Sequence, residues 1–332
     1  MRAAFYEKQG AAREVLVVAD LPDPQPRAGE VRVRVIASGI NPSDIKTRTG
    51  FGGKAMPFGR IVPHQDGAGV IDAVGPGVAA DTRIGERVWI YMAQWNRAFG
   101  TAAEFVVVPS AQAVRLAENV PFEIGASLGV PAMTAHRCLF ADGDLRGKRV
   151  LVQGGAGAVG NAAILLAKWA GAWVAATVSR EQQAEVARAA GVDLVINRHQ
   201  EDVPQAIRSA TGGHGVDRIV DVDISANIEV AIFCLARDGV VSAYSTESSD
   251  AKLTIPFFPA LLGGFSFRFV YVYTMPEAAM RHATEEISAC AASGAYVPQI
   301  AKTYALDAVT DAHEFQESGK AVGKVLVRLS DA

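Results

Sequence analysis

The residues with the clearest possible chemistry are three glycines, Gly155, Gly157 and Gly160, in the spacing G-x-G-x-x-G. An apolar run typical of a strand, 149–152, leads into them, and a helical pattern over 161–170 follows. Such glycines permit a tight turn, close approach of the backbone to a pyrophosphate, and close packing of helix on strand. The helix would also present free N–H groups and its positive dipole end to the phosphates. We therefore predict a dinucleotide-binding loop, because a glycine-rich surface turn leaves the following pattern unexplained.

The elements around this loop alternate between strand and helix. The sequence predicts helices over 126–140, 180–190, 203–211 and 226–236, and strands over 173–178, 194–197, 218–222 and 240–244. The apolar run 265–273 would extend the sheet at its edge, and a helix over 277–293, a short helix over 310–317 and a strand over 323–329 would end the chain. Strands that alternate with helices indicate right-handed βαβ units, so we predict an α/β fold with a doubly wound parallel sheet.

Residues 1 to about 120 have a different texture, with short candidate strands separated by glycine and proline. Val31, Val33 and Val35 alternate with arginines, which is the period of a half-buried strand. Many short strands without long helices predict a barrel-like antiparallel domain, which we expect to supply most of the substrate cleft. A length of 332 residues fits two such domains.

Composition excludes several classes of function. Half of the residues are hydrophobic, a fifth are charged and the formal net charge is −3, with no basic stripe, so nothing favours binding to nucleic acid or to an anionic membrane. The first residues lack an apolar signal core, and no apolar run is long enough to span a bilayer. Cys138, Cys234 and Cys290 are far apart and odd in number, which argues against disulfides or a C-x-x-C metal site and predicts a reducing cytoplasm.

A set of motifs along nearly the whole chain resembles the zinc-less quinone oxidoreductase branch of the medium-chain dehydrogenase/reductase superfamily. The motifs are Gly39-Ile40-Asn41-Pro42-Ser43-Asp44, Asp66-Gly67-Ala68-Gly69-Val70 with Val74-Gly75, Gly85-Glu86-Arg87-Val88, Ala126-Ser127-Leu128-Gly129-Val130, Met133-Thr134-Ala135, the glycine loop, Ala312-His313-Glu314 and Ser318-Gly319-Lys320-Ala321-Val322-Gly323-Lys324-Val325. The resemblance implies a GroES-like catalytic domain, 1–122 completed by 274–332, and a Rossmann domain that binds NADP, 123–273. It also implies a homodimer joined through the sheet edges at 265–273.

The same resemblance bears on metal binding. The zinc-dependent branch has a cysteine where this chain has Asn41 and a G-H-E triplet where it has His64-Gln65-Asp66, so that Gln65 takes the place of the histidine. A further cysteine ligand would fall near Gly129 or Val130, and 92–103 contains no cysteine for the structural zinc lobe. A catalytic zinc needs about three nitrogen, sulfur or carboxylate ligands. We therefore predict no metal.

The end of the second Rossmann strand predicts which cofactor binds. Sites for NAD place an Asp or Glu there, whereas this chain has Val178 followed by Ser179 and Arg180. A hydroxyl and a guanidinium suit a 2′-phosphate, so we predict NADPH. Ser179 could also begin the next helix through a capping box with Gln182, and Arg180 could be a solvated surface residue.

The resemblance assigns further contacts to the cofactor. Thr134 would lie on the nicotinamide side, and Arg198, after the third strand, would contact the cofactor. The remaining assigned residues are Ala156, Gly157, Ala158 and Val159 at the pyrophosphate, Ser225, Tyr244 and Ser245 at the adenine and ribose, and the backbone of Phe269, Val270 and Tyr271 at the carboxamide. The aromatic group 269–271 could instead be sheet core.

Without a metal, hydride transfer to a quinone or an enone leaves negative charge on an oxygen that needs a donor. Asn41 is the main candidate, because an amide donates without losing a proton, although it could equally cap the turn before Pro42. Asp44 would hold that loop, and Gln65 completes the candidate set. His64 would project near the mouth of the cleft and protonate an enolate, or would be a packed or surface histidine.

The sequence thus predicts an enzyme, an NADPH-dependent reductase of the quinone oxidoreductase type that passes hydride to a quinone or an α,β-unsaturated carbonyl without a metal. An enoyl-thioester reductase of the enoyl-CoA type is one alternative, which a basic patch for the CoA phosphate would favour. A non-catalytic NADPH-binding protein is another. Lys46 stands where similar quinone reductases often carry a tyrosine, so stacking of a quinone there is in doubt.

Overall fold

A computed structural model describes residues 1–330. By their contacts the residues form two units, which are described separately. The first comprises Met1–Pro131, Ala291–Gly294 and Ile300–Ala332, and the second Ala132–Cys290 and Ala295–Gln299. The predicted domains instead met at 122/123 and 273/274, and most of helix α11 (Glu277–Ala292) groups with the second unit. Within the described residues, no helix is long and apolar enough to cross a membrane.

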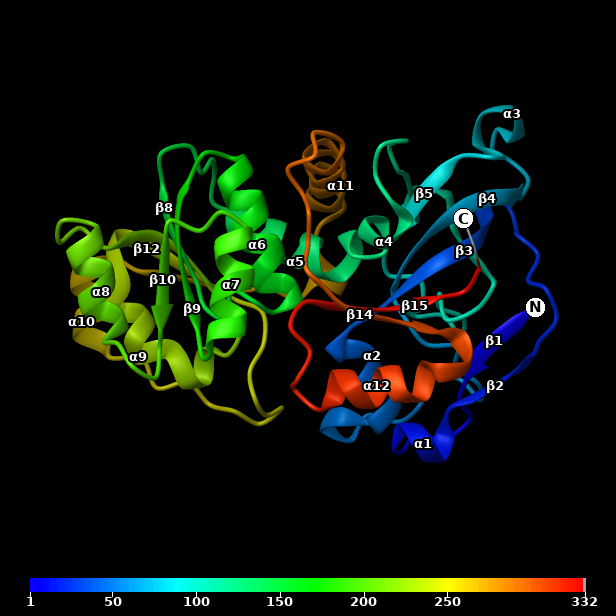
Figure 1. Ribbon diagram of the computed structural model, residues 1–332, viewed down its shortest axis with the longest axis horizontal. Coiled ribbons are helices and arrows are strands. Elements are labelled where there is room, and N and C mark those ends of the chain that lie inside the picture. Colours follow the sequence, from blue (N-terminus) through cyan, green and yellow to red (C-terminus); the bar gives the residue numbers. More distant parts are fainter. Residues whose placement is uncertain (331–332) are drawn as a thin grey trace. The chain divides into compact units, whose positions relative to one another are not determined.

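The second unit is built on a sheet of six strands that pair only in parallel (Figure 1). The strands are β8 (Arg149–Val152), β9 (Trp173–Val178), β10 (Leu194–Asn197), β11 (Val216–Asp221), β12 (Leu235–Ala243) and β13 (Ser266–Phe269). Their order, β10-β9-β8-β11-β12-β13, is 3-2-1-4-5-6 when they are numbered from β8, which is the order of the dinucleotide-binding Rossmann fold. The predicted doubly wound parallel sheet is confirmed.

Helices cover both faces of this sheet, with α5, α6 and α7 on one face and α8 and α9 on the other (Figure 1). The helices are α5 (Met133–Phe140), α6 (Ala158–Trp169), α7 (Glu181–Ala189), α8 (Val203–Ala210), α9 (Ile224–Cys234), α10 (Phe257–Gly263), α11 and the 3-10 turn η4 (Val272–Thr274). Leu151, Ile219 and Val241 of the strands pack with Ile207 and Ile228 of the helices to form the core. The strands read as continuous apolar runs because both faces are buried.

Two predicted elements of this region differ from the structure. The helix expected over 126–140 is broken into α4 (Phe122–Gly125), a π-helical turn η3 (Leu128–Ala132) and α5. Pro131 lies inside the π turn, and since proline lacks an N–H group, a regular α-helix cannot continue through it. The apolar run 265–273 forms a strand only over Ser266–Phe269, which does lie at the sheet edge as expected.

The first unit is built on a mostly antiparallel sheet, with the order β14-β15-β3-β4-β5-β7 and β6 paired to the long strand β3. The strands are β3 (Glu30–Ile40), β4 (Asp66–Val74), β5 (Arg87–Ile90), β6 (Phe105–Pro109), β7 (Ala113–Arg115), β14 (Ile300–Ala305) and β15 (Lys324–Arg328), and β1 (Arg2–Phe5) pairs separately with β2 (Val17–Asp20). Val31, Val33 and Val35 point into the core, as their alternation predicts. The last strand of the chain, β15, pairs with β3, so the C-terminal segment completes this sheet.

Short helices surround this sheet, and α12 packs against α2, β14 and β15 (Figure 1). They are α1 (Ala12–Val15), α2 (Pro42–Thr49), α3 (Ala80–Arg83), α4, α12 (Val309–Glu317) and the 3-10 turns η1 (Phe51–Gly53), η2 (Ser110–Gln112) and η5 (Leu306–Ala308). Helix α2 begins immediately after Asn41, and α12 carries His313. These two helices therefore position the polar groups described below.

Candidate functional site

The glycine loop has the geometry of a phosphate-binding turn. Gly154 has a φ of 75°, which favours glycine, and a Cβ on Gly160 would lie 2.2 Å from the carbonyl oxygen of Gly154. Gly157, just before α6, differs because a Cβ there would meet only that carbonyl oxygen, at 3.6 Å. The protein itself thus leaves room for a side chain at Gly157. This space, at the N-terminus of a 12-residue helix, suits a pyrophosphate.

Ser179, predicted to hold a 2′-phosphate, lies in direct contact with Arg198, which the resemblance assigned to the cofactor. Arg198 follows β10, and its Nε donates to Ser179 Oγ, at 2.8 Å, just beyond the end of β9. Arg180, the next residue, is exposed at the N-cap of α7. The predicted capping box from Ser179 to Gln182 is wrong. The N–H of Ser179 donates instead to the side chain of Gln183 at 2.9 Å, and Arg180 is the cap.

The other residues assigned to the cofactor lie at the same strand ends or on α5. Ser225 Oγ bonds Asp223 Oδ1 and Thr246 Oγ1, each at 2.7 Å, so its hydroxyl is already engaged. Tyr244 and Ser245 follow β12, and Thr134 is buried in the first turn of α5. In the glycine loop, Ala156 is buried, and Ala158 and Val159 begin α6. Their contact with a cofactor stays a prediction.

The segment 269–271 lies at the edge of the sheet, and its two aromatic side chains are not part of the core. Phe269 and Tyr271 are 66% and 51% exposed. Val270 is buried, and its N–H donates to the carbonyl oxygen of Ala243 at 2.8 Å. The alternative interpretation of the two aromatic side chains as sheet core is therefore wrong.

In the first unit, Asn41 belongs to a buried ionic network. Lys324 Nζ lies 2.7 Å from Asp66 Oδ2 and donates to Asn41 Oδ1 at 2.6 Å, while Asn41 Nδ2 donates to the same Asp66 oxygen at 2.8 Å. The side chains of Lys324 and Asp66 are 2% and 0% exposed. The other Asp66 oxygen, Oδ1, accepts from the N–H of Val130 at 2.8 Å. A buried ion pair needs such satisfaction of its remaining polar groups, because its desolvation is costly.

Asp44 lies beside this network in the first turn of α2. Its Oδ2 accepts from the N–H of Asn41 at 2.7 Å, and together the two residues form a capping box. The sequence thus predicted correctly that Asp44 holds this loop. Burial, with the nearby carboxylate of Asp66, raises the pKa of Asp44 to about 8, so this carboxyl keeps its proton at neutral pH.

This protonated carboxyl gives a testable pH dependence. Between pH 4 and 8 the folded chain holds a proton on Asp44 that the unfolded chain releases, so the stabilising contribution of this group, complete below about pH 4, is lost as pH rises. The slope is at most about 1.4 kcal/mol per pH unit. We expect Asp44→Asn to make the free energy of unfolding fall less steeply from pH 5 to 7, as measured by urea denaturation. The exposed Asp81→Asn is the control, and identical slopes for Asp44→Asn and wild type would contradict this assignment.

His64 is fully buried, so its predicted position at the mouth of a cleft is wrong. A chain of hydrogen bonds fixes its proton. Thr101 Oγ1 donates to the carbonyl of Asp66 at 2.5 Å, so Ser38 donates to Thr101 at 2.7 Å. His64 Nδ1 must then donate to Ser38 at 2.8 Å, and His64 Nε2 accepts from His313 Nε2 at 2.9 Å.

The imidazoles of His64 and His313 are both neutral. Burial lowers the pKa of His64 well below its usual range and that of His313 to about 3. The φ of His64, 80°, is rare for a residue with a side chain. The hydrogen bonds on both ring nitrogens hold it there, so the structure favours the interpretation of His64 as a packed histidine.

Two polar side chains, Asn41 and Gln65, stand where zinc-dependent relatives carry ligands, and both are hydrogen-bonded to neighbouring side chains. Gln65 exchanges hydrogen bonds with the side chain and backbone of Gln94, at 3.1 and 3.2 Å, and Asn41 is held by Lys324. Gly129 and Val130 offer no ligand atom on a side chain. The ammonium of Lys324 thus supplies the positive charge beside Asp66. The set of donors here does not fit a zinc ion.

Lys324 and His313 are the residues that the sequence analysis did not single out. Both occurred only inside motifs that carried the resemblance. Their partners lie 258 and 249 residues away along the chain, at Asp66 and His64. The one signal in the sequence was a lysine at the start of the apolar strand β15. A lysine is almost never fully buried without a partner, so its position indicated a buried ion pair.

Comparisons with known protein families give a match in each of the two units. The family model of the alcohol dehydrogenase GroES-like domain matches residues 27–118, and that of the zinc-binding dehydrogenase matches 158–289. A quinone oxidoreductase of Mus musculus is 30% identical over 73% of this chain and 72% of its own length. A 2-haloacrylate reductase of Burkholderia is 27% identical, over 98% of both chains.

Solved structures show the same architecture over the full length. A mycobacterial protein whose structure was determined with NADPH is 25% identical, with a TM-score of 0.84, over 99% of this chain and 100% of its own. The first unit is thus a GroES-like domain and the second a Rossmann domain, as the resemblance implied.

Proposed function

The chain belongs to the quinone oxidoreductase branch of the medium-chain dehydrogenase/reductase superfamily, and from that premise we propose that it is an NADPH-dependent reductase that acts on a quinone or an α,β-unsaturated carbonyl. The quinone oxidoreductase and 2-haloacrylate reductase relatives support this substrate class, since both names describe reduction of a small conjugated acceptor. Neither alternative from the sequence, an enoyl-thioester reductase or a non-catalytic binding protein, gains support from these relatives.

The observation that carries the proposal is the fit of the second unit to a phosphorylated dinucleotide. The open space at Gly157 would receive the pyrophosphate, and the contact between Arg198 and Ser179, with Arg180 beside it, would receive the 2′-phosphate. The last residue of β9, where sites for NAD carry an Asp or Glu, is Val178, so no carboxylate at that position repels the phosphate. The bound cofactor would supply a hydride, and these residues would bind and orient it.

Gly157 gives a direct test of this fit. Since a methyl group at this position meets no side chain of the protein, we expect Gly157→Ala to leave the melting temperature within about one degree of wild type. It should raise the Kd for NADPH roughly tenfold, because it fills the space at the pyrophosphate. Fluorescence titration measures the Kd. The control is Gly59→Ala, whose added methyl group meets nothing within 4 Å and which should bind as wild type. Unchanged binding by Gly157→Ala would remove this loop from the cofactor site.

On the substrate, we propose that Asn41 stabilises the oxygen that becomes negative as hydride arrives. One N–H of its amide is donated to Asp66, and the second N–H would donate to the substrate oxygen. Lys324, on the amide oxygen, fixes the orientation of this group and polarises it. The role needs no metal, and we propose that the enzyme is zinc-independent. The three cysteines are far apart in the sequence and odd in number, which fits a reducing compartment, for which we propose the cytoplasm.

A panel of acceptors tests the substrate class. Oxidation of NADPH would be followed with a benzoquinone, a polycyclic quinone, an aliphatic enone and a short enoyl-CoA. The proposal predicts turnover with quinones or with the enone. Turnover with enoyl-CoA alone would favour the thioester alternative, and cofactor binding without any turnover would favour the non-catalytic one.

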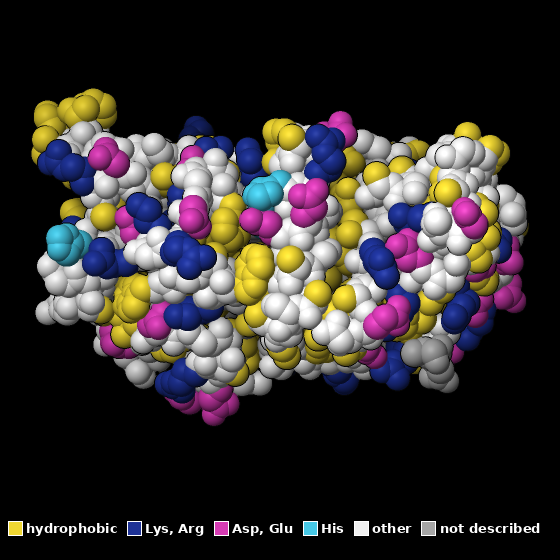
Figure 2. Space-filling view, turned by 90° about the horizontal axis from the view of Figure 1, so that it is seen from above, with side chains coloured by type: hydrophobic (Ala, Val, Ile, Leu, Met, Phe, Trp, Pro, Cys, Tyr) yellow, Lys and Arg dark blue, Asp and Glu magenta, His cyan; other side chains and the backbone are white. Residues whose placement is uncertain are grey.

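We propose further that the protein is a homodimer through the edge of its Rossmann sheet. Phe257, Phe258, Leu261 and Leu262 of α10 are at least 58% exposed, and β13 is an edge strand. Figure 2 shows hydrophobic side chains gathered at one end of the second unit. A second copy of the chain would cover this apolar surface and pair with the free edge.

The dimer can be tested with one substitution. We expect Leu262→Glu to halve the molar mass measured by light scattering after size exclusion, because a charge cannot be buried in an apolar interface without a partner. Ile84→Glu, on an exposed isoleucine of the first unit, should keep the mass of wild type. A wild-type protein that is monomeric at micromolar concentration would contradict the proposal.

A further inference from the structure

A group of three side chains in the second unit has no role in the function proposed above. His136 lies on α5, and His282 and Glu286 lie one turn apart on α11, so they share one face of that helix. One ligand atom of each residue lies within 4.8 Å of the other two. In the portion of the chain that the structure describes, this is the one such group of three or more histidine, cysteine or carboxylate side chains.

Two of the three distances within this group are close to those between the ligands of a metal ion. Glu286 Oε2 lies 2.6 Å from His136 Nε2 and 3.5 Å from His282 Nε2, so one carboxylate oxygen stands between two imidazole nitrogens. Ligands of a tetrahedral zinc at about 2.0–2.1 Å are separated by roughly 3.4 Å. The longer distance already matches, and the shorter one needs a shift of less than about 1 Å, which rotation of the Glu286 side chain would supply.

The group has a buried end and an open end. The side chain of His136 is 4% exposed, that of Glu286 31% and that of His282 57%. An ion could therefore enter from solvent and reach the inner histidine.

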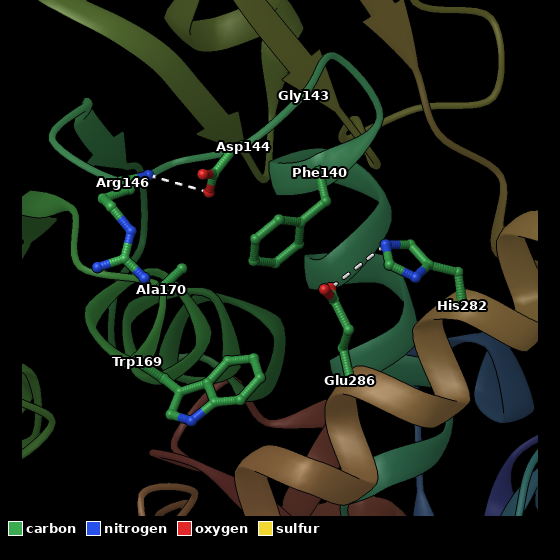
Figure 3. Close-up of a pocket in the computed structure, with 8 residues that line it drawn as sticks. All are labelled: Phe140, Gly143, Asp144, Arg146, Trp169, Ala170, His282 and Glu286. Carbon is green, nitrogen blue, oxygen red and sulfur yellow. Dashed lines mark hydrogen bonds and ion pairs between the residues drawn. The ribbon is translucent and has the colours of Figure 1, made fainter.

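A cavity of about 580 Å³ adjoins the open end (Figure 3). His282 and Glu286 line one side of it and point toward α5, while Phe140, Trp169 and Arg146 line the rest. Three protein ligands leave a fourth position on a tetrahedral ion, which is the arrangement of zinc sites with an exchangeable water. The cavity offers space for that water.

From these observations we propose that His136, His282 and Glu286 bind one divalent transition-metal ion of the Zn²⁺ class. Two imidazoles and a carboxylate suit zinc, whereas Mg²⁺ and Ca²⁺ prefer an all-oxygen set. The ion would connect α5 to α11 and so stabilise the second unit. The site uses none of the residues proposed for the reductase reaction and stands independently of that proposal.

The test uses the untagged full-length protein, stripped of metal and titrated with Zn²⁺ against a chromophoric zinc indicator. We expect one zinc per chain in wild type and an affinity at least tenfold lower in His282→Ala, which removes an exposed side chain and leaves the contact between His136 and Glu286 intact. Glu286→Gln should show a similar loss. The matched control is His199→Ala, an exposed histidine outside the group, which should bind as wild type.

Thermal melting gives an independent readout. Zinc should raise the melting temperature of wild type in a concentration-dependent way, and the same zinc concentration should raise that of His282→Ala by less. Binding of less than one zinc per chain by wild type at micromolar zinc, or equal affinities in wild type and His282→Ala, would overturn the proposal. The close contact of His136 and Glu286 would then be a hydrogen bond within the fold and no more.

Discussion

Lys324→Met is expected to lower the free energy of unfolding by about 3–5 kcal/mol, because it leaves the carboxylate of Asp66 buried without a counter-charge. The methionine also removes the donor that holds Asn41 Oδ1. Urea or thermal denaturation would measure the loss. Lys320→Met, an exposed lysine near the same strand, should stay within about 0.5 kcal/mol of wild type.

A second substitution separates the charge from the packing. Asp66→Asn in the Lys324→Met background removes the unpaired charge, so the double variant should be more stable than Lys324→Met alone. It should nevertheless show reduced reductase activity, because Asn41 is no longer fixed. A single variant as stable as wild type would mean that Asp66 is solvated or protonated, contrary to the buried ion pair described here.

Replacement of Arg180 and Arg198 together by alanine is expected to weaken binding of NADPH about a hundredfold and binding of NADH less than threefold. The reason is that both guanidiniums are assigned to the 2′-phosphate, which NADH lacks, and hydrogen bonds to charged groups contribute about 1.5–3 kcal/mol each. Arg198 already contacts Ser179, so each single variant should show a smaller selective loss.

The control for this pair of substitutions lies on α7, the helix that Arg180 caps. Arg188→Ala on α7 removes an exposed arginine that pairs with Glu181, and it should leave both affinities unchanged. Titration of cofactor fluorescence would give the two Kd values, for NADPH and for NADH, for each variant. Equal losses for NADPH and NADH would remove both arginines from the phosphate site and would leave the cofactor preference without its structural basis.

The Rossmann unit could be predicted from the sequence because its signals are local. Strands such as Trp173–Val178 and Leu194–Asn197 are found at the predicted residues, since buried parallel strands are short apolar runs between turns. The break at Pro131 was missed because the apolar pattern continues through it and hides the missing N–H. Strand β14 was missed because its residues are half-exposed and lack a clear period of two.

The polar site of the first unit could be predicted less well, because its residues depend on partners that are distant from them in the sequence. The sequence identified Asn41, Asp44 and His64, but the burial of His64 depends on His313, and the state of Asn41 depends on Lys324. Spacing along the chain does not encode such pairs. The pKa of Asp44 likewise follows from burial that only the folded chain provides.

Steady-state oxidation of NADPH and of NADH by the wild-type protein with 1,4-benzoquinone, after removal of metal with a chelator, tests the central claim most directly. We predict turnover that survives the chelator and a kcat/KM for NADPH at least tenfold above that for NADH. Turnover that requires added zinc, or a preference for NADH, would contradict the zinc-independent, NADPH-dependent reductase proposed from Arg198, Ser179 and Asn41.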